Sequence, residues 1–330
     1  MNYTIVRKYT ILILWIVFIP YSAFCQNEKT NYNKWKIGNL IFEQGEKGTF
    51  DEISVKDPSV VFYKNAWHLF YTARNESEYT TGYVSAKKLE DLNSAPRFEL
   101  EQIRGKTRYG CAPQIFFFEP QKKWYLIFQN RDSNYQPAFS TNTKIEEPKQ
   151  WTAPQKLLKK DSNKKWIDFW IIADKEKVYL FYTKEHSDII VRSTGINNFP
   201  NGWSKGNKIF DNVHEAVHIY KDIDKNEFHM IYELNNNGIR SFGMATANYL
   251  DGPWKKITDN YATGNQLQFT KETQPWTDMV SHGEIIRSGY NQDMEYDSEI
   301  CRWLIQGILK KDLNIEYPSL PWKLGVIEID

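Results

Sequence analysis

The sequence predicts an all-β fold, a five-bladed β-propeller, because three observations agree. Helical periodicity is absent over long stretches of the chain. Aromatic residues make up 15% of the 330 residues, which suits β-strands and clefts in which rings stack on sugars. One pattern recurs five times: a polar residue, a β-branched or aromatic run, a turn, and a second aromatic run. A β-sandwich is the alternative fold.

The five copies begin roughly 50 to 65 residues apart, the scale of one four-stranded propeller blade. They begin at Asp57 (DPSVVFY), Ala112 (APQIFFF), Asp168 (DFWIIA), Glu215 (EAVHIY) and His282 (HGEIIR). Third strands follow near 81, 137, 189 and 240, and a Trp opens a fourth strand in the middle copies. Because the first strand of each blade lines the axis, we expect the five leading residues to converge at one end of the channel.

Two further strands are predicted at 35–42 and 323–329, outside the five copies. We expect them to pair and complete the last blade, because this closes the ring and removes an open sheet edge. The predicted propeller is therefore a single catalytic domain over 35–330.

Residues 1–25 have the features of a signal peptide. A positively charged start precedes an apolar stretch and a small-residue exit at Ser22–Ala23. This pattern predicts export to the periplasm or out of the cell, with 26–34 as a short linker. Acylation of Cys25, which would make a lipoprotein, is an alternative that the bulky Phe24 disfavours. No other segment is apolar over enough residues to span a membrane.

Charge and cysteine content exclude several classes of protein. Lys and Arg number 42 and Asp and Glu 41, so the formal net charge is +1. This balance argues against a nucleic-acid-binding protein and against a disordered chain. Cys111 and Cys301 are the two cysteines beyond the signal, and they fall in blades that are not neighbours. We therefore predict two free thiols.

Acidic side chains occupy three of the five leading positions, at Asp57, Asp168 and Glu215, and His282 occupies a fourth. One such carboxylate on its own is most simply a satisfied polar residue, and His282 a core histidine. Three acids at one axis cost stability by repulsion, which predicts a functional site. Glycoside hydrolysis needs a carboxylic acid and a carboxylate, and a third carboxylate can raise the pKa of the acid. The longer Glu215 is the natural proton donor. The chain lacks a phosphate-binding glycine loop and a G-x-S-x-G motif, so kinase and serine-hydrolase chemistry are unsupported.

Six segments carry a resemblance to a known family. They are KDPSVVFY (56–63), CAPQIFFF (111–118), WIDFWII (166–172), HEAVHIY (214–220), YELNNNGIRSF (232–242) and VSHGEIIRSGYNQDM (280–294). In these segments the chain resembles glycoside hydrolase family 62, over about 35 to 328. Members of that family are five-bladed propellers that remove α-L-arabinofuranosyl groups from xylan.

The resemblance implies a role for each matching residue. Asp57 is implied as the general base that activates water in an inverting mechanism, Glu215 as the general acid, and Asp168 as the residue that tunes the pKa of Glu215. The implied lining of the sugar pocket is Lys56, Ala112, Pro113, Gln129, Ile167, Glu233 and Arg240. Tyr290 and Asn291 are implied to contact the xylan backbone. His282 is implied to ligate a structural, mostly water-coordinated Ca²⁺.

The sequence departs from the family at Arg108-Tyr109-Gly110, where members carry a large ring, and Tyr109 is the candidate substitute. The implied substrate is arabinoxylan or a related arabinose-decorated polysaccharide, hydrolysed by a monomer. A family 43-type β-xylosidase or arabinanase shares the same acids and stays an alternative. A non-catalytic sugar-binding propeller or a protein-binding scaffold is disfavoured, because neither needs the full acid set.

Overall fold

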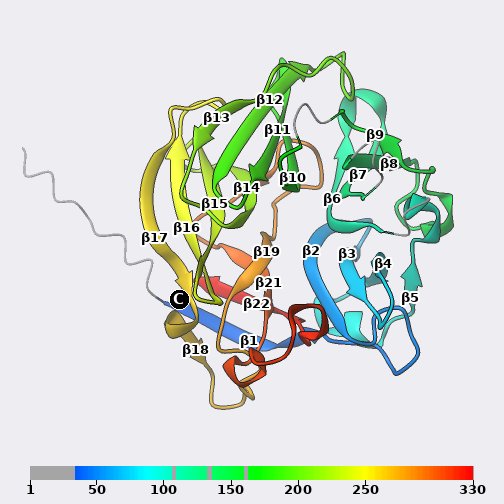
Figure 1. The fold of residues 1–330 in the computed structure, drawn as a ribbon, viewed down its shortest axis with the longest axis vertical. Coiled ribbons are helices and arrows are strands. Elements are labelled where there is room, and N and C mark those ends of the chain that lie inside the picture. The colour runs from blue at the N-terminus through cyan, green and yellow to red at the C-terminus, as the bar shows by residue number, and fades with distance from the viewer. Residues whose placement is uncertain (1–33, 106–108, 132–135, 160–162, 330) are drawn as a thin grey trace, which may run out of the picture. The chain divides into compact units, whose positions relative to one another are not determined.

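The computed structural model describes residues 34–105, 109–131, 136–159 and 163–329. One compact unit extends from Tyr32 to Asp330, and it contains five sheets arranged around an axis (Figure 1). The predicted five-bladed β-propeller is therefore confirmed. The predicted signal peptide, Cys25 and nearly all of the predicted linker lie outside the described residues.

Each blade is a sheet whose strands pair mostly in chain order from the axis outward. The first blade contains β2 (Ser54–Tyr63), β3 (Ala66–Arg74), β4 (Tyr79–Ala86) and β5 (Arg97–Glu99). The second contains β6 (Cys111–Phe118), β7 (Lys123–Gln129), β8 (Pro137–Asn142) and β9 (Gln155–Lys156). The third contains β10 (Trp166–Ala173), β11 (Lys177–Lys184), β12 (Asp188–Gly195) and β13 (Asn207–Phe210). The fourth contains β14 (Glu215–Asp222), β15 (Glu227–Asn236), β16 (Ile239–Ala247) and β17 (Lys255–Thr263), with β20 (Glu295–Tyr296) parallel to β14.

The fifth blade joins the two ends of the domain. Its strands are β19 (Ser281–Ile285), β21 (Arg302–Gly307), β22 (Lys323–Ile329), β1 (Trp35–Phe42) and β18 (Leu267–Phe269). Strand β1 pairs antiparallel with β22, as predicted. The buried Trp35 ring packs edge-on against Trp303 and donates from Nε1 to the carbonyl of Tyr261 at 2.8 Å. These contacts fix the N-terminal strand in the last blade and close the ring.

Aromatic side chains and glycines set how closely the strands of a blade stack. Tyr71 on β3 lies opposite Gly82 on β4, and Tyr232 on β15 lies opposite Gly243 on β16. A Cβ atom added at Gly82 would meet the Tyr71 ring at 2.3 Å, and one at Gly243 the Tyr232 ring at 2.4 Å. The two blades therefore use the same ring-over-glycine contact, which any larger residue would disrupt.

The segment between β19 and β21 crosses the end of the axis where the inner strands finish. Its carbonyls at Tyr290, Gln292 and Met294 accept backbone N–H groups from β6, β10 and β14, at 2.8, 2.9 and 3.1 Å. The buried Arg287 donates to Glu284 at 2.9 Å and to the carbonyl of Ile115 at 2.8 Å. This segment closes one end of the channel, so a ligand must enter from the other.

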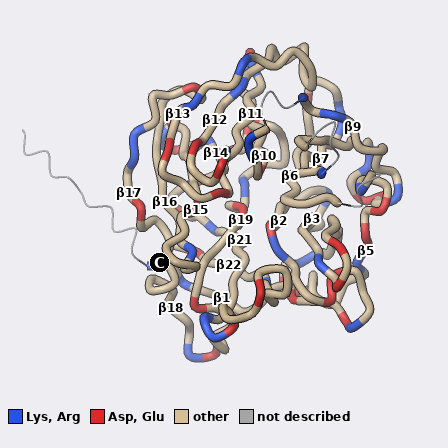
Figure 2. Tube along the Cα trace, viewed as in Figure 1, with Lys and Arg blue, Asp and Glu red and all other residues tan. Residues whose placement is uncertain are grey.

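Charged residues of both signs are interspersed along the outer strands and loops (Figure 2), as the near-zero net charge suggests. Cys111 and Cys301 are both buried and free, which confirms the prediction of two thiols. Among the described residues, no helix is long and apolar enough to cross a membrane.

Candidate active site

Each inner strand begins with a break in its pairing to the second strand of its blade. The register shifts lie between Lys56 and Ser59, Cys111 and Gln114, Ile167 and Trp170, Glu215 and His218, and Ser281 and Gly283. Four residues inside these bulges have left-handed backbones: Asp57 (φ 49°), Ala112 (φ 48°), Asp168 (φ 56°) and Ala216 (φ 52°). A left-handed non-glycine residue costs roughly 1–2 kcal/mol, so the surrounding structure must hold it in place. A bulge re-aims side chains at the end of a strand.

Neighbouring blades hold four of these five bulges by accepting a backbone N–H from the bulge. Asp57 N donates to Gln306 Oε1 on blade five, and Ala112 N donates to Thr72 Oγ1 on blade one, each at 2.8 Å. His282 N donates to Glu233 Oε2 on blade four at 2.8 Å. Ala216 N donates to Asp168 Oδ2 on blade three at 2.8 Å. Each N–H is therefore received by a polar side chain of the preceding blade.

The bulges also correct one predicted equivalence. Glu215 was expected to occupy the same position as Asp57 and Asp168, but the residue in that position is Ala216. Glu215 corresponds instead to Lys56, the last paired residue before the bulge of its blade. The pattern of apolar runs could not reveal this offset, because a bulge shifts the register by one residue without changing composition. In the alignment of the blades, Glu215 therefore lies one residue before the position that Asp57 and Asp168 occupy.

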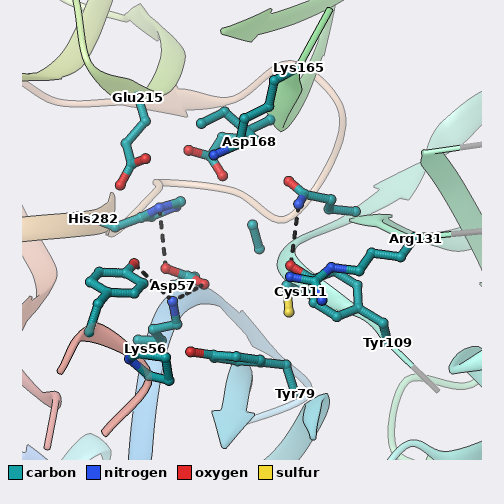
Figure 3. Close-up of a pocket in the computed structure, with 15 residues that line it drawn as sticks. Lys56, Asp57, Tyr79, Tyr109, Cys111, Arg131, Lys165, Asp168, Glu215 and His282 are labelled. Atoms are coloured by element: carbon teal, nitrogen blue, oxygen red, sulfur yellow. Dashed lines mark hydrogen bonds and ion pairs between the residues drawn. The ribbon is translucent and has the colours of Figure 1, made fainter. Parts of the chain in front are cut away.

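A pocket of about 280 Å³ lies where the bulges meet. This volume is at the small end for ligand sites and suits a single sugar ring. It is lined by Lys56, Asp57, Tyr79, Tyr109, Cys111, Ala112, Gln129, Arg131, Lys165, Ile167, Asp168, Glu215, His282, Tyr317 and Pro318. Figure 3 shows the carboxyl groups of Asp57, Asp168 and Glu215 and the His282 ring directed into it.

Most of the predicted site residues are brought together here. Those that line the pocket are Lys56, Asp57, Ala112, Gln129, Ile167, Asp168, Glu215 and His282. Arg240 donates a hydrogen bond to Glu215 and another to Glu233, so Glu233 is linked to Glu215 through Arg240. Pro113 is buried in β6.

Tyr290 and Asn291 are not at this site, so their predicted contact with a bound polysaccharide is wrong. They belong to the segment that closes the opposite end of the axis, where Tyr290 packs on Tyr63 and Phe117. Phe117 is five residues along β6 from Ala112, which is roughly 17 Å of strand. A loop between two strands of one blade can lie at either end of the propeller axis, and the sequence pattern does not indicate at which end it lies.

The sequence analysis did not assign Tyr79, Arg131, Lys165 or Tyr317 to the pocket. Tyr317 comes from the irregular segment before β22, which matches no repeat, so no pattern could have placed it. Tyr109 lines the pocket, and the Arg131 guanidinium lies 4.2 Å from its ring centroid. The candidate replacement for the expected large ring is thus in place, with one face covered by a cation.

Asp57 lies between two cationic groups. Its Oδ1 is 3.4 Å from His282 Nδ1, and its Oδ2 is 3.9 Å from Lys56 Nζ. Burial opposes charge on Lys56, but Asp57, with smaller effects of Tyr317, Tyr79 and Cys111, raises the pKa of Lys56. The Lys56 ammonium also bonds Tyr317 Oη at 3.2 Å and lies 5.2 Å from the Tyr79 ring centroid. These contacts hold the Asp57 carboxyl in one orientation facing the pocket.

Glu215 is bound by Arg240, which it shares with a second acid. Arg240 Nη1 donates to Glu215 Oε1 at 2.9 Å and also to Glu233 Oε1. Glu233 is fully buried and accepts from Ser281 Oγ at 2.6 Å. Burial alone would raise the pKa of Glu215, but Arg240, with smaller effects of His214 and His186, lowers it. In the free protein Glu215 is therefore a carboxylate.

Asp168 has the opposite behaviour. Burial, together with the negative charges of Glu215 and Asp57, raises its pKa to about 7, although His282 opposes this. The expectation that Asp168 keeps Glu215 protonated is thus reversed in the free protein. The physical reason is Arg240, whose charge favours the ionised form of Glu215 and leaves the proton on Asp168.

The His282 imidazole offers one ligand to a structural Ca²⁺ ion. Ca²⁺ takes six to eight oxygen ligands. Within the described ranges, no group of three clustered carboxylate, thiol or imidazole ligands includes His282. Burial opposes charge on this ring, yet Asp57, Asp168 and Glu233 raise its pKa, so a proton competes for the same nitrogen. A Ca²⁺ ion at His282 would therefore take most of its ligands from water, and we derive no catalytic step from a metal ion here.

Comparison with known proteins identifies several similar chains. The family described as Glycosyl hydrolase family 62 matches residues 39–328. Alpha-L-arabinofuranosidase C of Cellvibrio japonicus is 33% identical over 292 residues, which are 84% of this chain and 44% of that protein. The chain thus spans less than half the length of this curated relative.

Solved structures agree with the sequence comparison. The catalytic domain of a Coprinopsis cinerea GH62 α-L-arabinofuranosidase superposes with a TM-score of 0.82 at 31% identity, covering 89% of this chain and 96% of that one. An α-L-arabinofuranosidase of Podospora anserina, solved with cellotriose, gives 0.81 at 28% identity, covering 89% and 96%. A family 43 hydrolase at 14% identity, with a TM-score of 0.59 and coverage of 88% and 93%, shares the fold alone.

The raised pKa of Asp168 predicts a pH-dependent cost to stability. The folded state holds a proton with a pKa of about 7, against 3.8 for a free carboxyl, so stability falls as pH rises from about 4 to 7. Asp168→Asn keeps an oxygen for the Ala216 N–H and removes the ionisation. We expect the variant to gain stability over the parent across this range, by up to about 4 kcal/mol, with no further gain above pH 8. Urea unfolding at several pH values measures this, with the exposed Asp251→Asn as control. A difference independent of pH would show that Asp168 is not protonated.

Proposed function

Because the chain belongs to glycosyl hydrolase family 62, we propose that it is an α-L-arabinofuranosidase that removes arabinofuranosyl side groups from arabinoxylan with inversion. The observation that carries the proposal is one pocket, sized for a single sugar, into which Asp57, Asp168 and Glu215 all project. The name of the Cellvibrio japonicus relative supports the choice of sugar.

In this proposal Asp57 is the general base. An inverting glycosidase uses one carboxylate to deprotonate a water that attacks the anomeric carbon. Asp57 is fixed by Lys56 and His282 and faces the pocket, as a base must be to orient that water. Once Asp57 takes the proton, the neighbouring Lys56 and His282 still carry positive charge, which favours its return to solvent as the carboxylate.

Glu215 is the general acid, and it must acquire a proton before it can act. We propose that Asp168 supplies that proton when the sugar enters and displaces water from the pocket. Once it has given up this proton, the Asp168 carboxylate keeps its bond from the Ala216 N–H. Arg240 then stabilises the Glu215 carboxylate that forms as the leaving oxygen is protonated.

In this proposal the pocket holds the terminal sugar of the substrate, and the residues around the pocket determine which sugar can bind. A pocket of about 280 Å³ cannot enclose a polysaccharide chain, which supports attack on a side group rather than the backbone. Tyr79, Tyr109 and Tyr317 offer ring edges and hydroxyls around the sugar. A β-xylosidase or an arabinanase needs the same acids. Measuring the sugars released from arabinoxylan and from arabinan separates these alternatives, because the proposed activity releases arabinose from arabinoxylan.

The mechanism predicts both rate and stereochemistry. Asp57→Ala and Glu215→Ala should each lower kcat on wheat arabinoxylan by three or more orders of magnitude, because each removes a proton-transfer group. Unchanged circular dichroism and Tm are the control for folding. Proton NMR of the first product should show β-L-arabinofuranose, the inverted anomer. An α-anomer as the initial product would rule out Asp57 as a base.

A structural Ca²⁺ at His282 belongs to the same proposal, with water as its remaining ligands. If it binds there, chelation with EGTA should lower Tm by several degrees, and added CaCl₂ should restore it. His282→Ala should abolish that response. Equal Tm values in EGTA and CaCl₂ for the parent protein would exclude the ion.

Export rests on the pattern of residues 1–25. We propose that the segment is removed, and we expect the chain recovered from outside the cytoplasm to begin near Gln26. Intact-mass measurement of that material tests this. A mass that retains residues 1–25 would refute cleavage, and a lipid-sized mass increase with Cys25 at the N-terminus would show a lipoprotein.

A further inference from the structure

Two histidines flank the proposed general acid at the edge of the pocket. His186 lies in the turn between β11 and β12, and His214 immediately precedes β14. Their rings stack with centroids 4.6 Å apart. His186 Nδ1 is 3.4 Å and His214 Nε2 is 3.5 Å from Glu215 Oε2. In the part of the chain that the structure describes, this is the one group of three such ligands within 4.8 Å of one another.

Two of the three distances between ligand atoms match those of a tetrahedral zinc site. Zn²⁺ binds imidazole nitrogen and carboxylate oxygen at about 2.0–2.2 Å, so ligand atoms around it lie roughly 3.4 Å apart. Both measured nitrogen-to-oxygen distances agree with that value. Two histidines and one glutamate form a set that zinc uses with its fourth position open. The Glu215 oxygen concerned is Oε2, whereas Arg240 binds Oε1.

The hydrogen bonds of His186 decide how a metal ion could enter. Lys165 Nζ lies 2.8 Å from His186 Nε2 and donates to it, which leaves the His186 proton on Nδ1, 3.1 Å from the carbonyl of His214. A metal ion at Nδ1 must displace this proton, and Lys165 competes by charge. The His186 side chain is 31% exposed and that of His214 20%, so solvent reaches both.

We propose that His186, His214 and Glu215 form a binding site for a divalent transition-metal ion, with Zn²⁺ as the probe, and that the bound ion blocks hydrolysis. Imidazole ligands favour Zn²⁺ over Mg²⁺ and Ca²⁺, so the site is distinct from any calcium at His282. The inhibition, though not the binding, rests on the proposed role of Glu215. A metal ion on Oε2 removes the oxygen that would deliver the proton to the leaving group.

Calorimetric titration of the metal-free full chain with ZnCl₂ at pH 7 tests the binding. We expect one equivalent to bind, with affinity reduced tenfold or more in His186→Asn and in His214→Asn, and lost in the double variant. Lys165→Met should tighten binding, because the competing ammonium is gone. Glu185→Gln, beside His186 but outside the cluster, is the matched control and should bind as the parent does. Absence of Zn²⁺ binding by the parent, or equal binding by the double variant, would overturn the site.

Arabinose release in the presence of increasing Zn²⁺ tests the consequence. Each variant is compared with its own zinc-free rate, and unchanged Tm is the control for folding. We expect the parent to lose most of its activity, to regain it with EDTA, and the double variant to be insensitive. Inhibition that persists in the double variant would overturn the proposed cause. Binding without inhibition would refute the blockade and count against Glu215 as the acid. A protein that binds Zn²⁺ yet never releases arabinose would refute the proposed function but not the site.

Discussion

The bulge at the start of each inner strand is the constraint on which the site depends. Without it, a period of two would send alternate side chains into the sheet-to-sheet core rather than toward the axis. The left-handed residues Asp57, Ala112, Asp168 and Ala216 each carry a backbone cost. At Asp57, Ala112 and Ala216 a neighbouring blade offsets part of this backbone cost by accepting the N–H of the left-handed residue. The contacts that join the blades therefore also position the acids. Asp168 is an example, because its carboxyl group accepts the N–H of Ala216 from the next blade and also lines the pocket.

The electrostatics of the pocket follow from where the cations lie. Lys56 and His282 are placed beside Asp57, and Arg240 beside Glu215, whereas Asp168 has an N–H bond and the more distant charge of His282. One proton is thus shared unevenly between two repelling carboxyls, and the free protein keeps it on Asp168. In the proposed mechanism, substrate binding must shift that distribution before Glu215 can act as the acid.

The sequence predicted the fold well because its signals are local. Apolar runs, turns and the spare strands at 35–42 and 323–329 repeat in a form that only a closed ring of blades satisfies. Eight of the site residues predicted from the sequence also line the pocket. The sequence could not predict the strand register at Glu215, because its one-residue offset arises from a bulge. Nor could it predict at which end of the propeller Tyr290 lies, and the segment that contains Tyr290 closes the end opposite the pocket. Tyr317 and Lys165 reach the site from irregular segments, where no periodicity exists to locate them.

The arrangement around Glu215 explains how a shared fold can carry different reactions. Family 43 propellers superpose at 14% identity, so the ring of blades needs few particular side chains. The residues that set the charge state of Glu215 come instead from three separate places: Arg240 on β16, His214 before β14, and His186 in the β11–β12 turn. None of them belongs to an inner strand, but Arg240 also bonds Glu233, which accepts the N–H of His282 at the bulge of β19. The His186 and His214 side chains can therefore change with less effect on the bulges than Arg240 can, and substitution there would retune the acid while the blades stay closed.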